Sequence, residues 1–230
     1  MAIIRSLLFN IYYFTSCAVL SIGLTPFALF GRKVSYFCCQ VWNKNLVWSA
    51  KYIAGISYEI IGEIPQSPVI IASKHQSAWE TAIFVAMLPK AAYILKKELT
   101  YIPFFGWFML LSGMIPVDRK AGMSGIKKLI INSKKRLREG YSIIIFPEGT
   151  RKTYGDKPDY KSGIAAIYSS LETEIIPVAL NSGLLWPKSA FFKKPGKITL
   201  EFLEPIKPGL KKQEFMQQLE SKIETAIEKM

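Results

Sequence analysis

Two patterns of hydrophobic and polar positions divide the chain. No charged residue occurs between Ser6 and Gly31, and residues 34–55 repeat apolar positions at helical spacing up to Gly55. Apolar residues that recur every three or four positions mark one face of a helix. We therefore predict two N-terminal helices, over residues 3–30 and 34–55.

Beyond residue 55, short β-rich runs alternate with helical stretches. The predicted strands cover residues 58–61, 69–72, 92–95, 114–117, 142–146, 175–179 and 197–202, and the predicted helices cover residues 78–87, 123–138, 163–171 and 212–229. Such alternation predicts an α/β fold with a mostly parallel central sheet flanked by helices. The runs VIIAS and SIIIF are continuously apolar, which is typical of central strands covered on both faces.

The uncharged N-terminal stretch is long enough to meet a bilayer, since a spanning helix needs about 20 mostly apolar residues. Asn10, Thr15 and Ser16 interrupt its apolar character, and Gly23 and Pro26 interrupt its regularity. Spanning the bilayer and lying in its interface both remain open, with a buried helix hairpin as the plainer alternative. We expect membrane attachment, which divides the chain into an N-terminal helical membrane-binding segment (residues 1–55) and an α/β domain (residues 56–230).

Composition narrows the class of partner. Lys and Arg number 30 against 17 for Asp and Glu, a net charge of +13, while half of the residues are hydrophobic. A positive excess of this size indicates anionic partners such as nucleic acid, an anionic membrane surface or phosphorylated substrates. The apolar N-terminal stretch favours the membrane, and no nucleic-acid-binding signature occurs. The three cysteines show neither CxxC nor metal-ligand spacing, which predicts free thiols of a reducing compartment and no metal site.

Polar clusters follow three of the predicted strands. KHQSAWE follows VIIAS, DR follows MIPV, and PEGTR follows SIIIF. In open α/β sheets ligands bind outside the carboxyl ends of the strands. We therefore expect the three clusters to form one site.

His75 and Glu80 lie in the first cluster, and His75 is the one histidine of the chain. Histidine titrates near neutral pH and serves as a general base, and a carboxylate on its second ring nitrogen would hold the tautomer. Residues five apart on a helix lie on nearly opposite faces, so the pair meets only if His75 precedes the helix. A plainer interpretation makes Ser77 and Glu80 a capping box and His75 a loop residue.

The other two clusters offer groups that suit a phosphate. The planar guanidinium of Arg119, next to Asp118, matches phosphate geometry. The cluster PEGTR adds a carboxylate, a glycine that permits close backbone approach, a hydroxyl and a second guanidinium, from Glu148, Gly149, Thr150 and Arg151. The structural alternatives are a surface Asp-Arg pair and a turn with a Glu-Arg bridge.

Four stretches in this order resemble the conserved blocks of the 1-acyl-sn-glycerol-3-phosphate acyltransferase family, within the glycerolipid acyltransferases. They are residues 75–80, residues 113–119, residues 146–151 with FPEGTR, and residues 176–183. The resemblance covers about residues 55–205. Two positions depart from the family pattern, because Lys74 replaces the usual asparagine and Glu80 the usual aspartate.

The resemblance implies a glycerol-3-phosphate acyltransferase-like fold and a reaction. A fatty acyl group would pass from acyl carrier protein or coenzyme A to the sn-2 hydroxyl of lysophosphatidate, giving phosphatidate in phospholipid biosynthesis, with these thioesters as co-substrates and no bound cofactor. His75 and Glu80 would be catalytic, and the phosphate would be bound by Arg119, Glu148, Gly149, Thr150 and Arg151. The N-terminal segment would hold the enzyme on the cytoplasmic face of the cell membrane.

Two alternatives stay open at this point. One is an acyltransferase that acts on another lysophospholipid or on glycerol 3-phosphate. The other is a non-catalytic lipid-binding membrane protein that has kept the fold.

Overall fold

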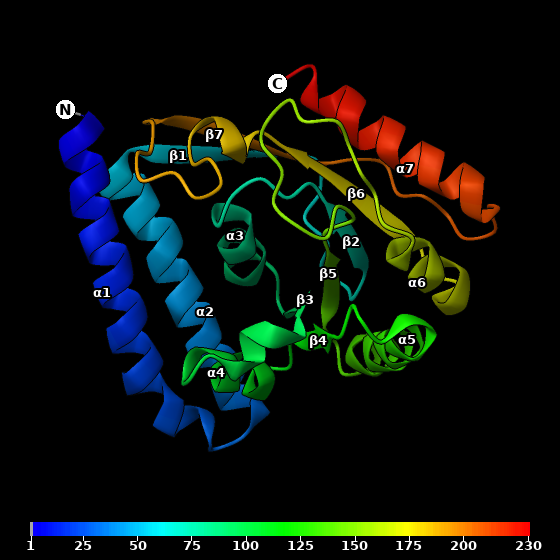
Figure 1. Cartoon of the computed structure of the whole chain (residues 1–230), viewed down its shortest axis with the longest axis horizontal. Helices are drawn as coiled ribbons and strands as arrows, with labels where there is room; N and C mark the ends of the chain where they lie inside the picture. The colour runs from blue at the N-terminus through cyan, green and yellow to red at the C-terminus, as the bar shows by residue number, and fades with distance from the viewer. Residues whose placement is uncertain (1) are drawn as a thin grey trace.

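The computed structural model describes residues 2–230, which fold around one seven-stranded sheet (Figure 1). The strands are β1 (Ile56–Ile61), β2 (Ile70–Ser73), β3 (Ala91–Lys96), β4 (Ile115–Val117), β5 (Ser142–Ile145), β6 (Ile175–Leu180) and β7 (Gly196–Phe202). Their order is β1-β7-β6-β2-β5-β3-β4, and all neighbours are parallel except β6 and β7. The predicted mostly parallel sheet is confirmed.

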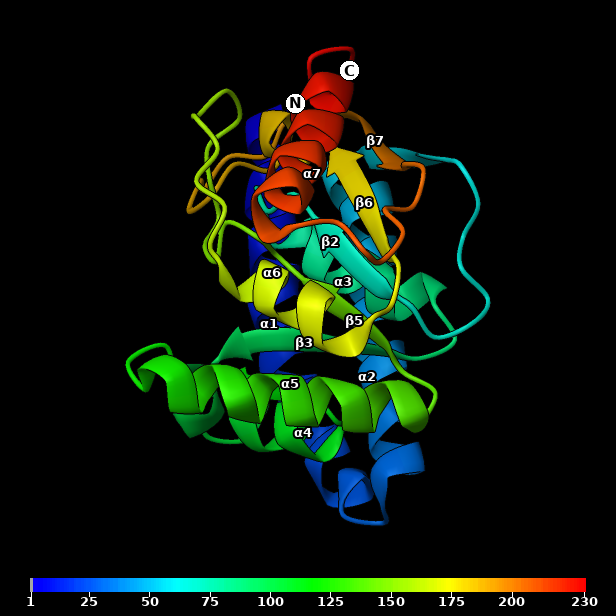
Figure 2. The same cartoon turned by 90° about the vertical axis from the view of Figure 1, so that its right-hand side faces the viewer.

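Helices cover both faces of the sheet. They are α3 (Trp79–Met87), α4 (Phe105–Leu111), α5 (Gly122–Arg138), α6 (Gly163–Leu171) and α7 (Lys212–Ile227). In Figures 1 and 2, α5, α6 and α7 lie on the side of the sheet opposite to α3. Every residue of β2, β5 and β6 is buried, as the continuous apolar runs predicted. The pattern did not predict α4, because residues 105–111 are apolar throughout and show no helical period.

The N-terminal region forms a helical hairpin, as predicted. Helix α1 (Ala2–Ala28) runs antiparallel to α2 (Arg32–Ser49), which continues into a π-helical turn (Ala50–Ala54). The turn ends at Gly55, whose φ of 76° is favourable for glycine. Helix α2 packs against α3, so the hairpin is part of the folded body. The division at residue 55 therefore stays a prediction about function.

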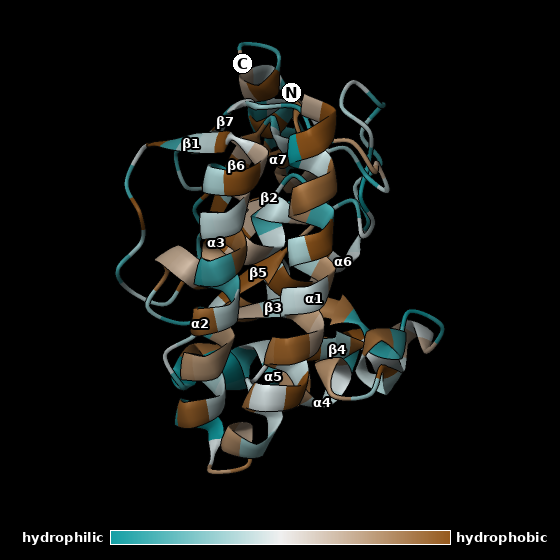
Figure 3. Cartoon of the chain, turned by 90° about the vertical axis from the view of Figure 1, so that its left-hand side faces the viewer, coloured by the Kyte–Doolittle hydropathy of each residue, from teal (hydrophilic) through white to brown (hydrophobic). Residues whose placement is uncertain are grey.

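Helix α1 has one face on the protein and one face exposed. Among the described residues it is the one helix that is long and apolar enough to cross a membrane. Its inner face is held by the connection between β6 and β7, where the Ser6 hydroxyl donates to the Lys193 carbonyl at 3.0 Å and the Asn10 amide donates to the Phe191 carbonyl at 2.8 Å. Hydrophobic residues recur along the length of both helices of the hairpin (Figure 3), and many of those in α1 are exposed.

Strand direction determines where the polar clusters meet. β2, β3, β4, β5 and β6 are parallel to one another, so their carboxyl ends lie at the same edge, whereas β1 and β7 run in the opposite direction. The segments that begin with Lys74, Asp118 and Phe146 leave the sheet at this edge. A fourth segment, beginning with Asn181 after β6, leaves there too.

Candidate active site

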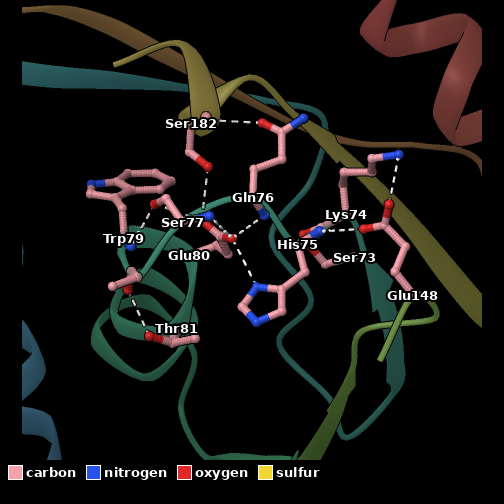
Figure 4. Close-up of polar contacts among 12 residues, drawn as sticks. Ser73, Lys74, His75, Gln76, Ser77, Trp79, Glu80, Thr81, Glu148 and Ser182 are labelled. Atoms are coloured by element: carbon pink, nitrogen blue, oxygen red, sulfur yellow. Dashed lines mark hydrogen bonds and ion pairs between the residues drawn. The ribbon is translucent and has the colours of Figure 1, made fainter. Parts of the chain in front are cut away.

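His75 and Glu80 are in direct contact beyond the end of β2. His75 lies in the loop before α3, Glu80 lies in the first turn of the helix, and the His75 Nδ1 atom is 2.9 Å from Glu80 Oε1. The other ring nitrogen points away from the carboxylate (Figure 4) and has no hydrogen-bond partner among residues 2–230. The imidazole side chain is 13% exposed. A substrate can therefore reach the outer nitrogen while the carboxylate holds the inner one.

The Glu80 carboxylate is fully buried and saturated with hydrogen bonds. Its Oε1 atom accepts from the backbone N–H groups of Gln76 and Ser77, both at 2.6 Å, and its Oε2 atom accepts from the hydroxyls of Ser77 at 3.0 Å and Ser182 at 2.8 Å. Burial would raise the pKa of this carboxyl, but the hydrogen bond and charge of His75, with the other donors, lower it. Glu80 is therefore a carboxylate that accepts and never donates.

The same contacts realise half of the predicted capping box. The Glu80 side chain reaches back to the Ser77 backbone N–H, while the Ser77 hydroxyl accepts from the Trp79 N–H at 2.8 Å at the start of α3. Capping and orientation of His75 are thus carried out by one side chain. The choice between the two interpretations of Glu80 disappears, because the cap brings the carboxylate to the imidazole.

Aromatic rings fix the plane of the imidazole. Phe146, the first residue after β5, stacks on His75 with ring centroids 3.9 Å apart and an interplanar angle of 14°. Tyr93 of β3 stacks on the far side of Phe146, and its hydroxyl donates to the Glu80 carbonyl at 3.0 Å. One face of the imidazole is therefore covered, and the ring is held between the sheet and the helix.

A buried ionic cluster lies behind His75. Lys74 is 3% exposed, and its Nζ atom lies 2.9 Å from Glu148 Oε1 and 2.7 Å from Glu224 Oε1 on α7. The second oxygen of Glu148 accepts from the His75 backbone N–H at 3.1 Å. Burial raises the pKa of the Glu148 carboxyl, and the nearby Lys74 charge opposes this shift. The cluster ties the backbone of His75 to the C-terminal helix.

The residues of FPEGTR lie around the same loop. Gly149 has a φ of 67°, which favours glycine, and a Cβ atom built there would lie 3.7 Å from Nη1 of Arg119. The guanidinium that follows β4 therefore lies against the turn that follows β5. The Lys152 N–H donates to the His75 carbonyl at 2.8 Å, which fastens this turn to the loop that contains His75.

Arg119, Thr150 and Arg151 are exposed at this edge. Neither guanidinium forms an ion pair within the described part of the chain, so both are available to an anion. Burial raises the pKa of Tyr13 on α1 to about 12, and the positive charge of Arg151 opposes this shift. Glu148, in contrast, is buried against Lys74 and His75. That it contributes to phosphate binding stays a prediction, and its contacts make it a residue that positions the loop.

A groove lies beside this site. A groove of about 950 Å³ separates residues 154–158 from α7 and reaches Lys74 and Gln76. The described residues that line it do not include His75 or the two arginines. It therefore opens behind the ionic cluster, away from the outer nitrogen of the imidazole.

Comparisons with known proteins identify the family. The sequence model of the acyltransferase family matches residues 55–181. A 1-acyl-sn-glycerol-3-phosphate acyltransferase of Pseudomonas aeruginosa is 36% identical over 200 residues, covering 85% of this chain and 77% of that protein. The chain belongs to the 1-acyl-sn-glycerol-3-phosphate acyltransferase family. A member from Saccharomyces cerevisiae is 28% identical, over 85% of this chain and 69% of that protein.

A solved structure of a family member has the same fold. The crystal structure of the 1-acyl-sn-glycerophosphate acyltransferase from Thermotoga maritima superposes with a TM-score of 0.78, covering 100% of this chain and 99% of that one at 21% identity. The similarity extends to the N-terminal hairpin, because it spans the whole chain. The expected acyltransferase fold is thereby confirmed.

Sequence reasoning on this acyltransferase left several site residues without a role. Ser182 binds Glu80, Phe146 stacks on His75, and Glu224 pairs with Lys74 from α7. The position of Ser182 directly after a predicted strand was an available signal. Glu224 offered none, because its place beside Lys74 follows from the packing of α7 on β6.

Proposed function

We propose that this protein transfers a fatty acyl group from an acyl thioester to the sn-2 hydroxyl of lysophosphatidate and releases phosphatidate. The observation that carries the proposal is the contact of His75 Nδ1 with Glu80, which leaves the outer ring nitrogen free at a sheet edge with two unpaired guanidinium groups. The relative from Pseudomonas aeruginosa is named for an enzyme that acylates this acceptor.

In the proposed reaction the outer nitrogen of His75 takes the proton of the substrate hydroxyl. The freed oxygen attacks the thioester carbonyl carbon, and the tetrahedral intermediate collapses with loss of the thiolate, which receives the proton from the imidazolium. Glu80 stabilises the imidazolium through Nδ1 and keeps the outer nitrogen unprotonated in the resting state. No acyl-enzyme is required, because the substrate supplies the nucleophile.

Two arginines are proposed to bind the substrate phosphate. Arg119 and Arg151 are exposed and unpaired in the described chain, and Gly149 lets the backbone turn beside Arg119. Guanidinium groups bind phosphate through two parallel hydrogen bonds, which orients as well as attracts it. Holding the phosphate in this way would fix the adjacent glycerol hydroxyl near His75. Thr150, next to Arg151, would add a hydroxyl donor.

The protein is proposed to work at the cytoplasmic face of the cell membrane, with α1 lying in the interface. The inner face of α1 is fastened to a polar connection through Ser6, Asn10 and the buried Lys193. A helix crossing the bilayer would carry the Lys193 ammonium and the irregular backbone of this connection into hydrocarbon, where both are costly even when paired within the protein. Acyl carrier protein and acyl-coenzyme A are the proposed donors, both anionic partners for a chain of net charge +13.

One assay tests the proposal. Purified protein is mixed with lysophosphatidate and either acyl-coenzyme A or acyl carrier protein, and formation of phosphatidate is followed beside lysophosphatidylcholine and glycerol 3-phosphate as acceptors. We expect turnover with lysophosphatidate that is lost in His75→Ala. Turnover with only one of the other acceptors would mean that lysophosphatidate is not the substrate. Absence of turnover with all acceptors would favour a non-catalytic lipid-binding protein.

A further inference from the structure

Residues 102–111 form the least polar internal segment of the α/β domain. Their sequence, IPFFGWFMLL, contains no polar or charged side chain. It follows a short 3-10 helix (Lys97–Tyr101) and includes all of α4. A helix that is hydrophobic all round belongs in a protein core or in lipid. The packing around α4 therefore decides whether it is a core helix or a lipid-facing helix.

Only one side of α4 is covered by protein. Phe105 and Phe108 pack on Trp42 of α2, with ring centroids 5.9 and 5.7 Å from it. The opposite side and the preceding turn form an exposed apolar patch of Leu99, Tyr101, Ile102, Phe104, Trp107 and Leu110. The large side chain of Trp107 is 49% exposed. An apolar patch of this kind marks an interaction surface, because water would otherwise cover it at a cost in free energy.

The patch continues the exposed face of α1. Helix α4 packs against both helices of the hairpin and lies beside the half of the hairpin in which the two helices join (Figures 1 and 3). Large hydrophobic side chains make up most of the exposed face of α1, which also includes Arg5 and Thr15. They are Ile3, Ile4, Leu7, Leu8, Ile11, Phe14, Val19, Ile22 and Phe27. One lipid surface can cover both regions, whereas a protein partner would need to match a helix and a separate loop. The occupant that fits is a membrane.

Length and composition set the depth of the contact. The seven residues of α4 rise about 10 Å, roughly a third of the hydrocarbon core, so this helix cannot span a bilayer. Tyr101 and Trp107 are the aromatic types that favour the interface, and Lys96 and Lys97 precede the patch where anionic headgroups would lie. The expected position is within one leaflet.

We propose that residues 99–110 insert into one leaflet as a second membrane contact beside α1. The inference rests on the proposed function at a membrane surface. A second contact would fix the orientation of the site relative to the bilayer. The segment leaves the sheet after β3, at the edge that carries the site, and Lys97 pairs with Asp118 at 3.3 Å next to Arg119. Insertion places the Arg119 guanidinium at the depth of lipid phosphates.

Quenching of tryptophan emission by brominated lipids tests the contact in the full-length protein. The vesicles contain equimolar phosphatidylcholine and phosphatidylglycerol with bromine on the acyl chains. The emission of wild type minus that of Trp107→Phe isolates Trp107 from the four other tryptophans. We expect the brominated lipids to quench the emission of Trp107 obtained in this way. As a control, Ile131→Trp adds a tryptophan at an exposed position of α5, and its emission should stay unquenched.

An unquenched Trp107 on vesicle-bound protein would overturn the proposal. A shift of its emission that follows protein concentration without vesicles would also overturn it, since a second copy would then cover the patch. For turnover, Trp107→Glu should lower the rate about tenfold on vesicle-borne lysophosphatidate and leave a dispersed short-chain analogue unaffected, while Trp107→Phe keeps both. Equal losses on both substrates would contradict insertion. The quenching result stands whether or not the protein turns over lysophosphatidate, which separates the two proposals.

Discussion

The Lys74 ammonium lies 2.7 Å from Glu224 Oε1, across 150 residues of sequence. Glu224 also accepts from the Tyr160 hydroxyl at 2.9 Å, and Lys74 reaches Glu148 on its other side. The residue before the proposed general base is thus held by α7. A buried lysine is accommodated at this position because α7 and the turn after β5 both present a carboxylate to it.

Replacing Lys74 by methionine is expected to destabilise the fold strongly. Two carboxylates would be left facing each other with Glu148 buried, and breaking a buried ion pair costs about 3–5 kcal/mol of unfolding free energy. Urea denaturation measures the change. The matched control is Lys197→Met, which removes an exposed pair with Glu59 and should change stability little. Similar losses in the two variants would mean that the cluster is not structural.

The activity of variants at His75 and Glu80 should depend on whether the imidazole and a carboxylate are both retained. His75→Ala removes the proposed base and is expected to lower the rate by about 10²–10⁴-fold with an unchanged unfolding midpoint. Glu80→Asp keeps a carboxylate and should stay active, whereas Glu80→Ala leaves the buried donors of Ser77 and Ser182 unpaired and should be inactive. Steady-state kinetics on folded protein measures the series. Equal activity in the two Glu80 variants would reduce this residue to a helix cap.

Glu80 also predicts a pH dependence of stability. Its folded pKa is lowered from the ordinary 4.5, so its ionised form stabilises the fold. This stability is fully present above the unfolded pKa and is lost as the pH falls through the folded one. The difference in unfolding free energy between wild type and Glu80→Gln should therefore shrink between about pH 7 and about pH 3. Urea titrations at both values measure it, and a constant difference would contradict the lowered pKa.

The two guanidinium groups should affect affinity more than turnover. Arg119→Ala and Arg151→Ala are each expected to raise KM for lysophosphatidate about tenfold, because a charge-assisted hydrogen bond to the phosphate is lost. kcat should change less. The control is Arg138→Ala, because Arg138 is exposed but lies on α5, outside the proposed phosphate site. A KM that is unchanged in either variant would remove that arginine from the phosphate site.

Lys193 is expected to hold the start of α1. Its ammonium binds Asn10 Oδ1 and the carbonyls of Ala190 and Phe191, and burial lowers its pKa. Lys193→Met should therefore speed hydrogen exchange in residues 5–13, measured by mass spectrometry. Lys188→Met, an exposed lysine of the same connection, should not. Equal protection in both variants would show that the helix is held without the Lys193 ammonium.

Local sequence was sufficient for most of the secondary structure. All seven strands and the hairpin were predictable, because period and apolar runs are local properties. The helix α4 was missed for the same reason, since a wholly apolar segment has no period to detect. Phe146 and Ser182 lie near the carboxyl ends of predicted strands, so a position in the site could be predicted for both. Their partners, His75 and Glu80, could not be assigned because contacts across the sheet depend on strand order.

The sequence by itself determined the α/β class, the three polar clusters and the family, since these depend on residue type and spacing along the chain. Tertiary structure alone decided that β2, β5 and β6 lie side by side, and so that Glu80 meets Ser182 and Lys74 meets Glu224. It also decided that only one face of α4 is covered. The physical reason is that burial and hydrogen bonding across distant segments arise from packing, which no local pattern records.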